Sequence, residues 1–368
     1  MYYEKELRAL ERAGRLRKRE LYEERLTDFS SNDYLGLAHD KMLHRLTCQK
    51  IDQNTLHATK ASLLVNGYHP IHKAFEDHLC RLNGFEEGVV VGSGFNANIA
   101  LIEALVRKGD MLFMDEKYHA SGVLATQIES VNVTFFEHNN MAQLREMLEN
   151  SHAKRKIIAV EGIYSMDGDM VPREVFDLAC EYDALLIVDE AHSSGVVGAN
   201  LCGVYDHYGI AIEPNFIKMG TLGKAYGSFG AYILATSHII EYLLNRAKPL
   251  IYATSLSLYD TALAHEALIY MSEHKESIKE QIALRRKAVE EELGIKSDSL
   301  IFPIHIGDNR AVMQIKEALA AEGFSVGAIR EPTVPSAIIR LIARLEPSIE
   351  ELRRACRLIN EQSKRYEA

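Results

Sequence analysis

Short apolar runs separated by amphipathic stretches occupy the middle of the chain, from about residue 86 to residue 239. Seven such runs occur: Gly88–Val91, Met111–Met114, Val131–Phe135, Ile157–Val160, Ala184–Val188, Phe216–Met219 and Ala231–Leu234. Runs of this length between helical segments are typical of buried strands in a mostly parallel sheet. The pattern therefore predicts an α/β fold with a seven-stranded sheet, in which a ligand binds outside the carboxyl ends of the strands.

The flanking parts of the chain show other patterns. Residues 4–24 are rich in Arg, Leu and Glu at helical spacing, which predicts a helix, and Phe29–Gly36 reads as a strand that runs into a loop. Further on, the pattern predicts a long helix over 259–292, strands over 300–306, 325–329 and 338–342, and helices over 311–322 and 348–362. We therefore expect an N-terminal helix and arm (1–40), a large α/β domain (41–245) and a smaller C-terminal α+β domain (246–368).

Composition narrows the class of protein. The chain has 368 residues and a net charge of −10, which argues against nucleic acid as a partner because nucleic-acid binders present basic patches. No apolar stretch approaches the ~20 residues of a membrane span, and no apolar segment follows the polar N-terminus as in a signal peptide. The five cysteines are scattered without a C-x-x-C pair, so we expect no disulfide framework, no metal site and a cytoplasmic location.

A lysine surrounded by glycines follows one of the predicted strands. Lys224 comes shortly after the Phe216–Met219 run and is flanked by Gly220, Gly223 and Gly227. A lysine in this position is usually a solvated surface residue. The glycines, however, allow the backbone to approach a ligand closely and leave room around the amine, and burial there would favour its nucleophilic form. Lys224 is therefore a candidate nucleophile.

An aspartate and a histidine follow another predicted strand. The Ala184–Val188 run ends in Asp189-Glu190-Ala191-His192, so we expect Asp189 to be buried and charge-paired, with His192 near it. These four residues also spell a helicase box, but a helicase needs an upstream phosphate loop, and the nearest similar stretch lies downstream with other spacing. A lysine, a carboxylate and an imidazole at strand ends are what a pyridoxal phosphate enzyme requires. The lysine forms a Schiff base with the cofactor, and the carboxylate keeps the pyridine nitrogen protonated.

A glycine turn at the start of a predicted helix is a candidate phosphate site. Gly92–Ala97 follows the run that ends at Val91, and backbone amides at a helix N-terminus bind phosphate groups. The same turn reads G-x-G-x-x-A, and Asp115 ends the next strand at about the distance of a ribose-binding acid. An NAD-dependent dehydrogenase therefore stays as an alternative, although it gives the lysine, aspartate and histidine no shared role.

Other polar residues lie at strand ends or in apolar surroundings. His119 follows the Met111–Met114 run and could stack on a planar cofactor, and Ser165 could contact the phenolic oxygen of the cofactor. The acidic cluster around Ser165 lacks the alternating oxygen ligands of a calcium site. Arg340 is flanked by apolar residues, and a buried arginine needs an anion such as a substrate carboxylate.

Taken together, these segments resemble the α-oxoamine synthases, a family of fold-type-I pyridoxal phosphate transferases. The resemblance runs in order from about residue 4 to residue 359 and rests on Phe29–Leu37, Gly92–Asn98, His119–Ser121, Ser165–Asp169, Val188–His192, Thr221–Lys224 and Tyr252–Ser255. In the C-terminal part, Ile306–Asn309 and Ala328–Pro335 are similar to the biotin-pathway members rather than the glycine-using ones.

The resemblance implies roles for residues around pyridoxal 5'-phosphate. The catalytic residues would be Lys224, which carries the cofactor, Asp189 on the pyridine nitrogen, His119 stacked on the ring, and His192. His192 and Ser165 would contact the phenolic oxygen. Gly94, Phe95 and Thr221 would hold the phosphate, together with Thr254 of the second subunit of a homodimer whose active sites lie at the interface.

The resemblance also implies the substrates. L-Alanine would condense with pimeloyl-CoA or pimeloyl-acyl carrier protein and lose carbon dioxide. Arg340 would bind the amino-acid carboxylate, Arg17 or a neighbour the end of the acyl chain, and Asn32 would lie near the substrate. The chain departs from the family pattern at Ala61–Leu64, Ala337 and Ile342, on the acyl-thioester side. A family member that uses glycine or another thioester is the alternative.

Overall fold

The computed structural model describes residues 2–19, 21–128 and 131–366, and the chain forms two compact units. The larger unit comprises Leu35–Ser165 and Asp169–Lys279, and the smaller one comprises Met1–Tyr34, Met166–Gly168 and Glu280–Ala368. This division differs from the expected limits at residues 40 and 245, because the N-terminal residues pack with the C-terminal part of the chain in one unit.

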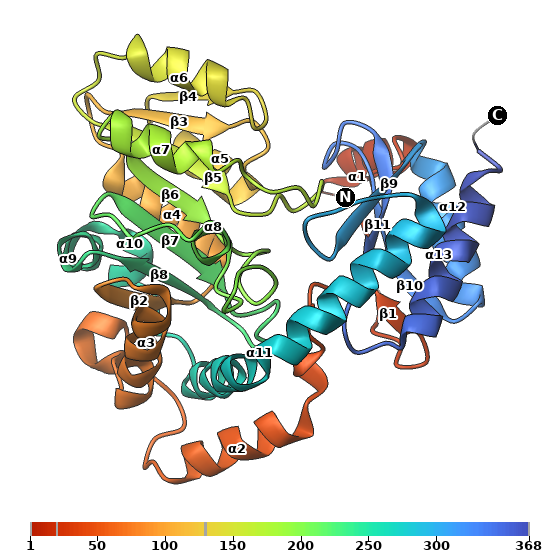
Figure 1. The fold of residues 1–368 in the computed structure, drawn as a ribbon, viewed down its shortest axis with the longest axis horizontal. Coiled ribbons are helices and arrows are strands. Elements are labelled where there is room, and N and C mark those ends of the chain that lie inside the picture. Colours follow the sequence, from red (N-terminus) through yellow and green to blue (C-terminus); the bar gives the residue numbers. More distant parts are fainter. Residues whose placement is uncertain (1, 20, 129–130, 367–368) are drawn as a thin grey trace. The chain divides into compact units, whose positions relative to one another are not determined.

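The larger unit is built on a seven-stranded sheet. Its strands lie in the order β2 (Glu87–Val91), β8 (Ala231–Ala235), β7 (Phe216–Thr221), β6 (Leu185–Asp189), β5 (Lys156–Glu161), β3 (Met111–Asp115) and β4 (Val133–Phe136) (Figure 1). The strands from β7 to β4 are parallel, whereas β8 is antiparallel to both β7 and β2. Each strand contains or overlaps one of the seven apolar runs, so the predicted mostly parallel sheet is confirmed.

Helices cover both faces of this sheet, which explains why its strands are apolar throughout. On one face, α4 (Gly94–Leu105), α9 (Ser237–Arg246) and α10 (Lys248–Ile251) pack on alternate strand residues in one apolar core. On the other face, α7 (Glu174–Glu181) packs against β6. The remaining helical segments of this unit are η1 (Leu37–His39), α2 (Lys41–Asp52), η2 (Leu63–Gly67), α3 (Pro70–Asn83), α5 (Ala120–Ile128), α6 (Met141–Glu149) and α8 (Val204–Tyr208).

The smaller unit contains a four-stranded sheet with helices. Its strand order is β1 (Thr27–Phe29), β10 (Phe324–Ile329), β11 (Ala337–Ile342) and β9 (Ile301–Gly307), with β1 parallel to β10 and the other pairs antiparallel. Helix α12 (Asn309–Ala321) packs on β10 and on α13 (Ile349–Ser363). The predicted α+β character of this part is confirmed. The long helix α11 (Leu258–Leu293) contributes residues to both units.

The N-terminal helix is shorter than its sequence pattern suggests. Helix α1 spans Glu4–Arg12 and buries none of its residues, so the prediction of a helix up to residue 24 is wrong. The chain leaves the helix at Gly14, whose φ of 63° lies in the left-handed region that favours glycine. In the parts of the chain that the structure describes, no helix combines the length and apolar character needed to cross a membrane.

A buried arginine connects the N-terminal segment of the smaller unit with its C-terminal sheet. Arg344 is 1% exposed, and its Nη1 and Nη2 donate to Asp28 Oδ2 at 2.6 Å and to Asp33 Oδ2 at 3.0 Å. Burial alone raises the pKa of Asp28, but hydrogen bonds from Ser31 and Ser30 and the charge of Arg344 outweigh it and hold this pKa below its ordinary value. The arginine charge is thus compensated inside the unit.

We predict that Arg344→Met lowers the free energy of unfolding by about 3–5 kcal/mol, because it leaves two buried carboxylates without their counter-charge. Urea unfolding followed by circular dichroism measures this change. The matched control is Arg354→Ala, since Arg354 pairs with Glu322 at 2.9 Å on the surface and is 54% exposed. Its loss should cost about 1 kcal/mol or less. Equal effects of the two substitutions would contradict the prediction.

Candidate active site

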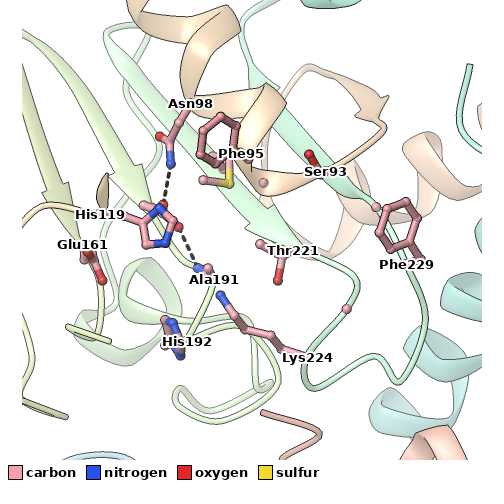
Figure 2. Close-up of a pocket in the computed structure, with 15 residues that line it drawn as sticks. Ser93, Phe95, Asn98, His119, Glu161, Ala191, His192, Thr221, Lys224 and Phe229 are labelled. Atoms are coloured by element: carbon pink, nitrogen blue, oxygen red, sulfur yellow. Dashed lines mark hydrogen bonds between the residues drawn. The ribbon is translucent and has the colours of Figure 1, made fainter. Parts of the chain in front are cut away.

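A cavity of about 310 Å³ opens at the carboxyl ends of the parallel strands of the larger unit. The strands β5, β6 and β7 end at it with Glu161, Asp189 and Thr221, and the loop after β7 and the N-terminus of α4 complete its wall (Figure 2). Its lining consists of Ser93, Gly94, Phe95, Asn98, His119, Glu161, Asp189, Ala191, His192, Met219, Thr221, Gly223, Lys224, Phe229 and Gly230. The site therefore lies where a parallel sheet is expected to bind its ligand.

Asp189 is a buried carboxylate with a hydrogen-bond donor on each oxygen. It is 4% exposed, and its Oδ2 accepts from Asn98 Nδ2 at 2.9 Å while its Oδ1 accepts from the Ala191 backbone N–H at 3.0 Å. Asn98 is in turn fixed, since its Nδ2 also donates to Ser121 Oγ at 3.0 Å and its Oδ1 accepts from Tyr118 Oη at 2.7 Å. These contacts set the orientation of the carboxylate.

The same network fixes the proton on His119. Ser121 Oγ accepts from Asn98, so its single hydrogen is available to His119 Nδ1, which lies 2.6 Å away. The Nδ1 atom is therefore an acceptor, and the neutral ring carries its proton on Nε2. Burial lowers the pKa of His119, the charge of Asp189 raises it, and the charge of Lys224 lowers it further. The net direction is downward, which agrees with a neutral imidazole near pH 7.

Lys224 lies in the loop that follows β7, and its amine points into the cavity toward His119 and Ala191 (Figure 2). His192 lines the same cavity and is 5% exposed. The structure thus brings together Lys224, Asp189, His192 and His119, which the sequence places far apart.

The glycines around Lys224 serve different purposes from those expected. A Cβ at Gly220 would collide with the Tyr232 ring, and one at Gly227, whose φ is 58°, would collide with the Ala38 backbone. Both glycines therefore accommodate neighbouring protein. Among the three, Gly223 is the one that lines the cavity.

One end of the cavity suits a phosphate group. Helix α4 begins at Gly94 with Ser93 as its cap, and a Cβ at Gly94 would lie 2.7 Å from Thr221 Cγ2. The Thr221 Oγ1 atom is buried and has no hydrogen-bond partner within the described residues. Backbone N–H groups at a helix N-terminus and an unsatisfied hydroxyl are donors that an anion can use. Phe95 borders this end and is 45% exposed.

Several predicted residues lie outside the cavity lining. Ser165 donates its backbone N–H to Glu161 Oε2 at 3.0 Å, and Thr254 is exposed and forms an isolated bridge with Ser62. The predicted substrate residues belong to the smaller unit. There Arg340 Nη1 donates to Asn32 Oδ1 at 2.9 Å, and the exposed Arg17 Nη2 donates to Thr333 Oγ1 at 3.0 Å. The roles of these residues stay predictions.

Asp115 would bind the ribose in the alternative that the chain is an NAD-dependent dehydrogenase, but its oxygens already accept other hydrogen bonds. Its oxygens accept from His138 Nδ1 at 3.1 Å and from the backbone N–H groups of Lys117 and Asn139, each at 2.9 Å. His138 Nε2 also lies 2.8 Å from Asp169 Oδ2. Asp115 is fully buried and does not line the cavity, so it is not placed to bind a ribose.

Known proteins similar to this chain define its family. The family described as aminotransferase class I and II matches residues 24–359. The chain belongs to the class I and II aminotransferase family. The 8-amino-7-oxononanoate synthase of Helicobacter pylori is 42% identical over 364 residues, with 98% of each chain covered. A putative 8-amino-7-oxononanoate synthase of Aquifex aeolicus is 36% identical, with 96% of this chain and 95% of the relative covered.

Solved structures of known proteins share the fold of this chain. The 8-amino-7-oxononanoate synthase of Francisella tularensis superimposes with a TM-score of 0.77 at 25% identity and covers 92% of this chain and 98% of its own. A Sphingomonas wittichii serine palmitoyltransferase gives a TM-score of 0.86 at 24% identity, with coverages of 93% and 88%, and is alike in fold. The resemblance to the α-oxoamine synthases and to fold type I is confirmed.

Two cavity residues went unnoticed in the sequence. Helix α4 is largely apolar but carries the amides Asn96 and Asn98, and the buried one of these two polar positions is Asn98, which is the signal that could have revealed it. Glu161 ends β5 in the same way as Asp189 ends β6, and the two are register partners. An acid at a strand end next to another acid is the signal there.

We predict that Asn98→Ala lowers the free energy of unfolding by about 1–3 kcal/mol, because it leaves Asp189 Oδ2 and Tyr118 Oη buried without partners. Chemical denaturation of the ligand-free chain measures this loss. Asn96→Ala on the same helix is the matched control, since Asn96 is only half-buried. It should change stability by about 0.5 kcal/mol or less. Similar values for both variants would show that the Asn98 network does not stabilise the site.

A second prediction concerns pH. Burial lowers the pKa of His138, but the hydrogen bonds that its ring donates to the Asp115 and Asp169 carboxylates, together with their charges, outweigh burial and raise this pKa to about 9. A raised histidine pKa adds stability that is fully present below its unfolded value of about 6.5 and is lost as pH rises through the folded value. The stability difference between the wild type and His138→Gln should therefore shrink by about 1–3 kcal/mol between pH 6 and pH 10. Exposed His152→Gln should show no such trend, and a flat difference for His138→Gln would refute the prediction.

Proposed function

We propose that the chain is an 8-amino-7-oxononanoate synthase, which condenses L-alanine with a pimeloyl thioester with loss of carbon dioxide and uses pyridoxal 5'-phosphate. The observation that carries the proposal is a single cavity that holds the Lys224 amine, the doubly hydrogen-bonded Asp189 carboxylate and the unpartnered Thr221 hydroxyl. The relatives named 8-amino-7-oxononanoate synthase support it, because the one from Helicobacter pylori is 42% identical over nearly the full length.

The residues of the cavity fit this cofactor. Thr221 Oγ1 and the N-terminus of α4 at Gly94 and Phe95 would hold the phosphate, which is the partner that the buried hydroxyl lacks. Asp189 would bind the pyridine nitrogen. When bound, pyridoxal phosphate supplies an aldehyde that reacts with amines and an electron-poor ring that accepts electron density from the substrate.

The chain's own groups then divide the work. The Lys224 amine would hold the aldehyde of the cofactor, and the free amine would take the proton from the alanine α-carbon and later return a proton to the product. The Asp189 carboxylate, oriented by Asn98, keeps a proton on the ring nitrogen. The neutral His119 ring would pack against the cofactor and, through its Nε2 hydrogen, would donate to an oxygen of the acyl group. His192 and Ser165 bind the phenolic oxygen.

The remaining residues define the substrate side. Arg340 binds the alanine carboxylate, because a guanidinium can donate two parallel hydrogen bonds to a carboxylate. Asn32 helps to hold the guanidinium, since its Oδ1 accepts from Arg340 Nη1 at 2.9 Å. Arg17 binds the far carboxylate of the pimeloyl chain, whose carrier is coenzyme A or an acyl carrier protein. Thr254 completes the phosphate site of the second subunit in a homodimer.

We expect pyridoxal phosphate to colour the purified protein yellow and borohydride to fix it on Lys224, as located by peptide mass spectrometry. Lys224→Ala should lose this label and lower alanine-dependent thiol release by at least about 100-fold, because the same amine moves the protons. Lys296→Ala is the control, since Lys296 is 82% exposed. A label on another lysine would contradict the proposal. Preference for glycine or for a different thioester in the same assay would point to another α-oxoamine synthase.

A further inference from the structure

A second carboxyl group in the cavity has no role in the reaction described above. Glu161 is the last residue of β5 and is 2% exposed. Its Oε2 accepts from the Ser165 backbone N–H at 3.0 Å, whereas its Oε1 is buried and has no hydrogen-bond partner within the described residues. Figure 2 shows Glu161 beside the cavity on the side of His119, with the Lys224 amine between it and Thr221.

Ionising both Glu161 and Asp189 would be unfavourable, because two buried negative charges would repel each other. They are register partners at the ends of adjacent parallel strands, and both are at least nine-tenths buried. Two neighbouring buried carboxyl groups favour a state in which one keeps its proton. Asp189 has a donor on each oxygen, whereas Glu161 has a single donor, so the carboxylate form is better supported at Asp189.

The surrounding charges agree with this assignment. Burial raises the pKa of Glu161 well above its ordinary value, and the charges of Asp189 and Asp115 raise it too, while Lys224 and the Ser165 N–H lower it. The net direction is upward, which favours the protonated, neutral form of Glu161. Its proton lies on Oε1, because Oε2 already accepts a hydrogen bond.

We propose that Glu161 is a neutral hydrogen-bond donor that binds an electron-rich oxygen of the ligand held at Lys224. This inference rests on the proposed function and adds a positioning residue to it. A buried donor without a hydrogen-bond partner is destabilising, and a ligand oxygen within reach would remove that destabilisation on binding. The oxygen belongs either to the cofactor or to the amino-acid substrate, and the two are separated by experiment.

The first test compares Glu161→Gln with Glu161→Met in the full-length chain. Glutamine keeps an acceptor for the Ser165 N–H and an N–H donor toward the cavity, whereas methionine keeps the length of the side chain without either. Two constants are measured, the affinity for pyridoxal phosphate and the KM for alanine. We expect both constants of Glu161→Gln to stay within about 3-fold of the wild type, and one of those of Glu161→Met to worsen by about 10- to 100-fold. If the loss appears in pyridoxal phosphate affinity, measured by absorbance titration, the partner is a cofactor oxygen. If it appears only in the KM for alanine, the partner is a substrate oxygen.

Two results would overturn the proposal. Equal losses in both variants would mean that Glu161 acts as a carboxylate, and wild-type behaviour of both would mean that its oxygen serves only water. Thermal unfolding of each variant, with the wild-type transition as reference, checks that Glu161→Met is folded. If it is not, the infrared measurement below decides.

The second test needs neither cofactor nor activity, so it still decides the protonation state if the proposed function fails. Infrared spectra of the ligand-free chain should contain a carboxylic acid C=O band at pH 8 that Glu161→Gln removes. Glu76→Gln is the matched control, because Glu76 is also buried and burial raises its pKa to about 7, but it is bonded to Tyr68 and Val90 outside the cavity. Its band should fade on going from pH 6 to pH 8, while that of Glu161 persists. Absence of a band assigned to Glu161 at pH 8 refutes the proposal.

Discussion

The burial of the Asp189 carboxylate is the constraint around which the larger unit is arranged. A carboxylate with 4% exposure is tolerated only if its oxygens accept hydrogen bonds, and two segments of the chain donate them. The chain that follows β6 turns back to offer the Ala191 N–H, and α4 offers the Asn98 amide. Since α4 also starts at the end of the cavity that suits a phosphate group, one helix contributes to both ends of the cavity.

Parallel strand order supplies the rest of the site. The strands β5, β6 and β7 run side by side, so Glu161, Asp189 and Thr221 reach the same edge of the sheet although they are distant in sequence. The two acids become neighbours by register alone, and two adjacent buried carboxyl groups favour a state in which one of them keeps its proton. A cavity with one anion, one neutral acid and one lysine amine can therefore both hold charge and move protons.

The sequence predicts the strands of this fold well and their arrangement poorly, for physical reasons. Strands buried on both faces are apolar throughout, so all seven runs were visible, whereas their order depends on pairing between distant segments. The helix at the N-terminus was overestimated, because its polar residues match a helical period while Gly14 ends it locally. In the site, residues at strand ends such as Lys224 and Asp189 were evident. Asn98 and Glu161 could be recognised only in the structure, because their importance lies in their positions next to Asp189, which is distant from both in sequence.

The hydrogen bonds that connect Asn98 with His119 through Ser121 have one more consequence. An amide cannot exchange its donor and acceptor without turning over, and both ends of Asn98 are engaged, by Tyr118 on one side and by Asp189 and Ser121 on the other. The donor and acceptor directions of the hydrogen bonds that lead from Asn98 through Ser121 to His119 are thus set by an amide, which does not titrate. Replacing Asn98 or Ser121 by an apolar residue would therefore interrupt the hydrogen bonds that fix the Nδ1 atom of His119 as an acceptor.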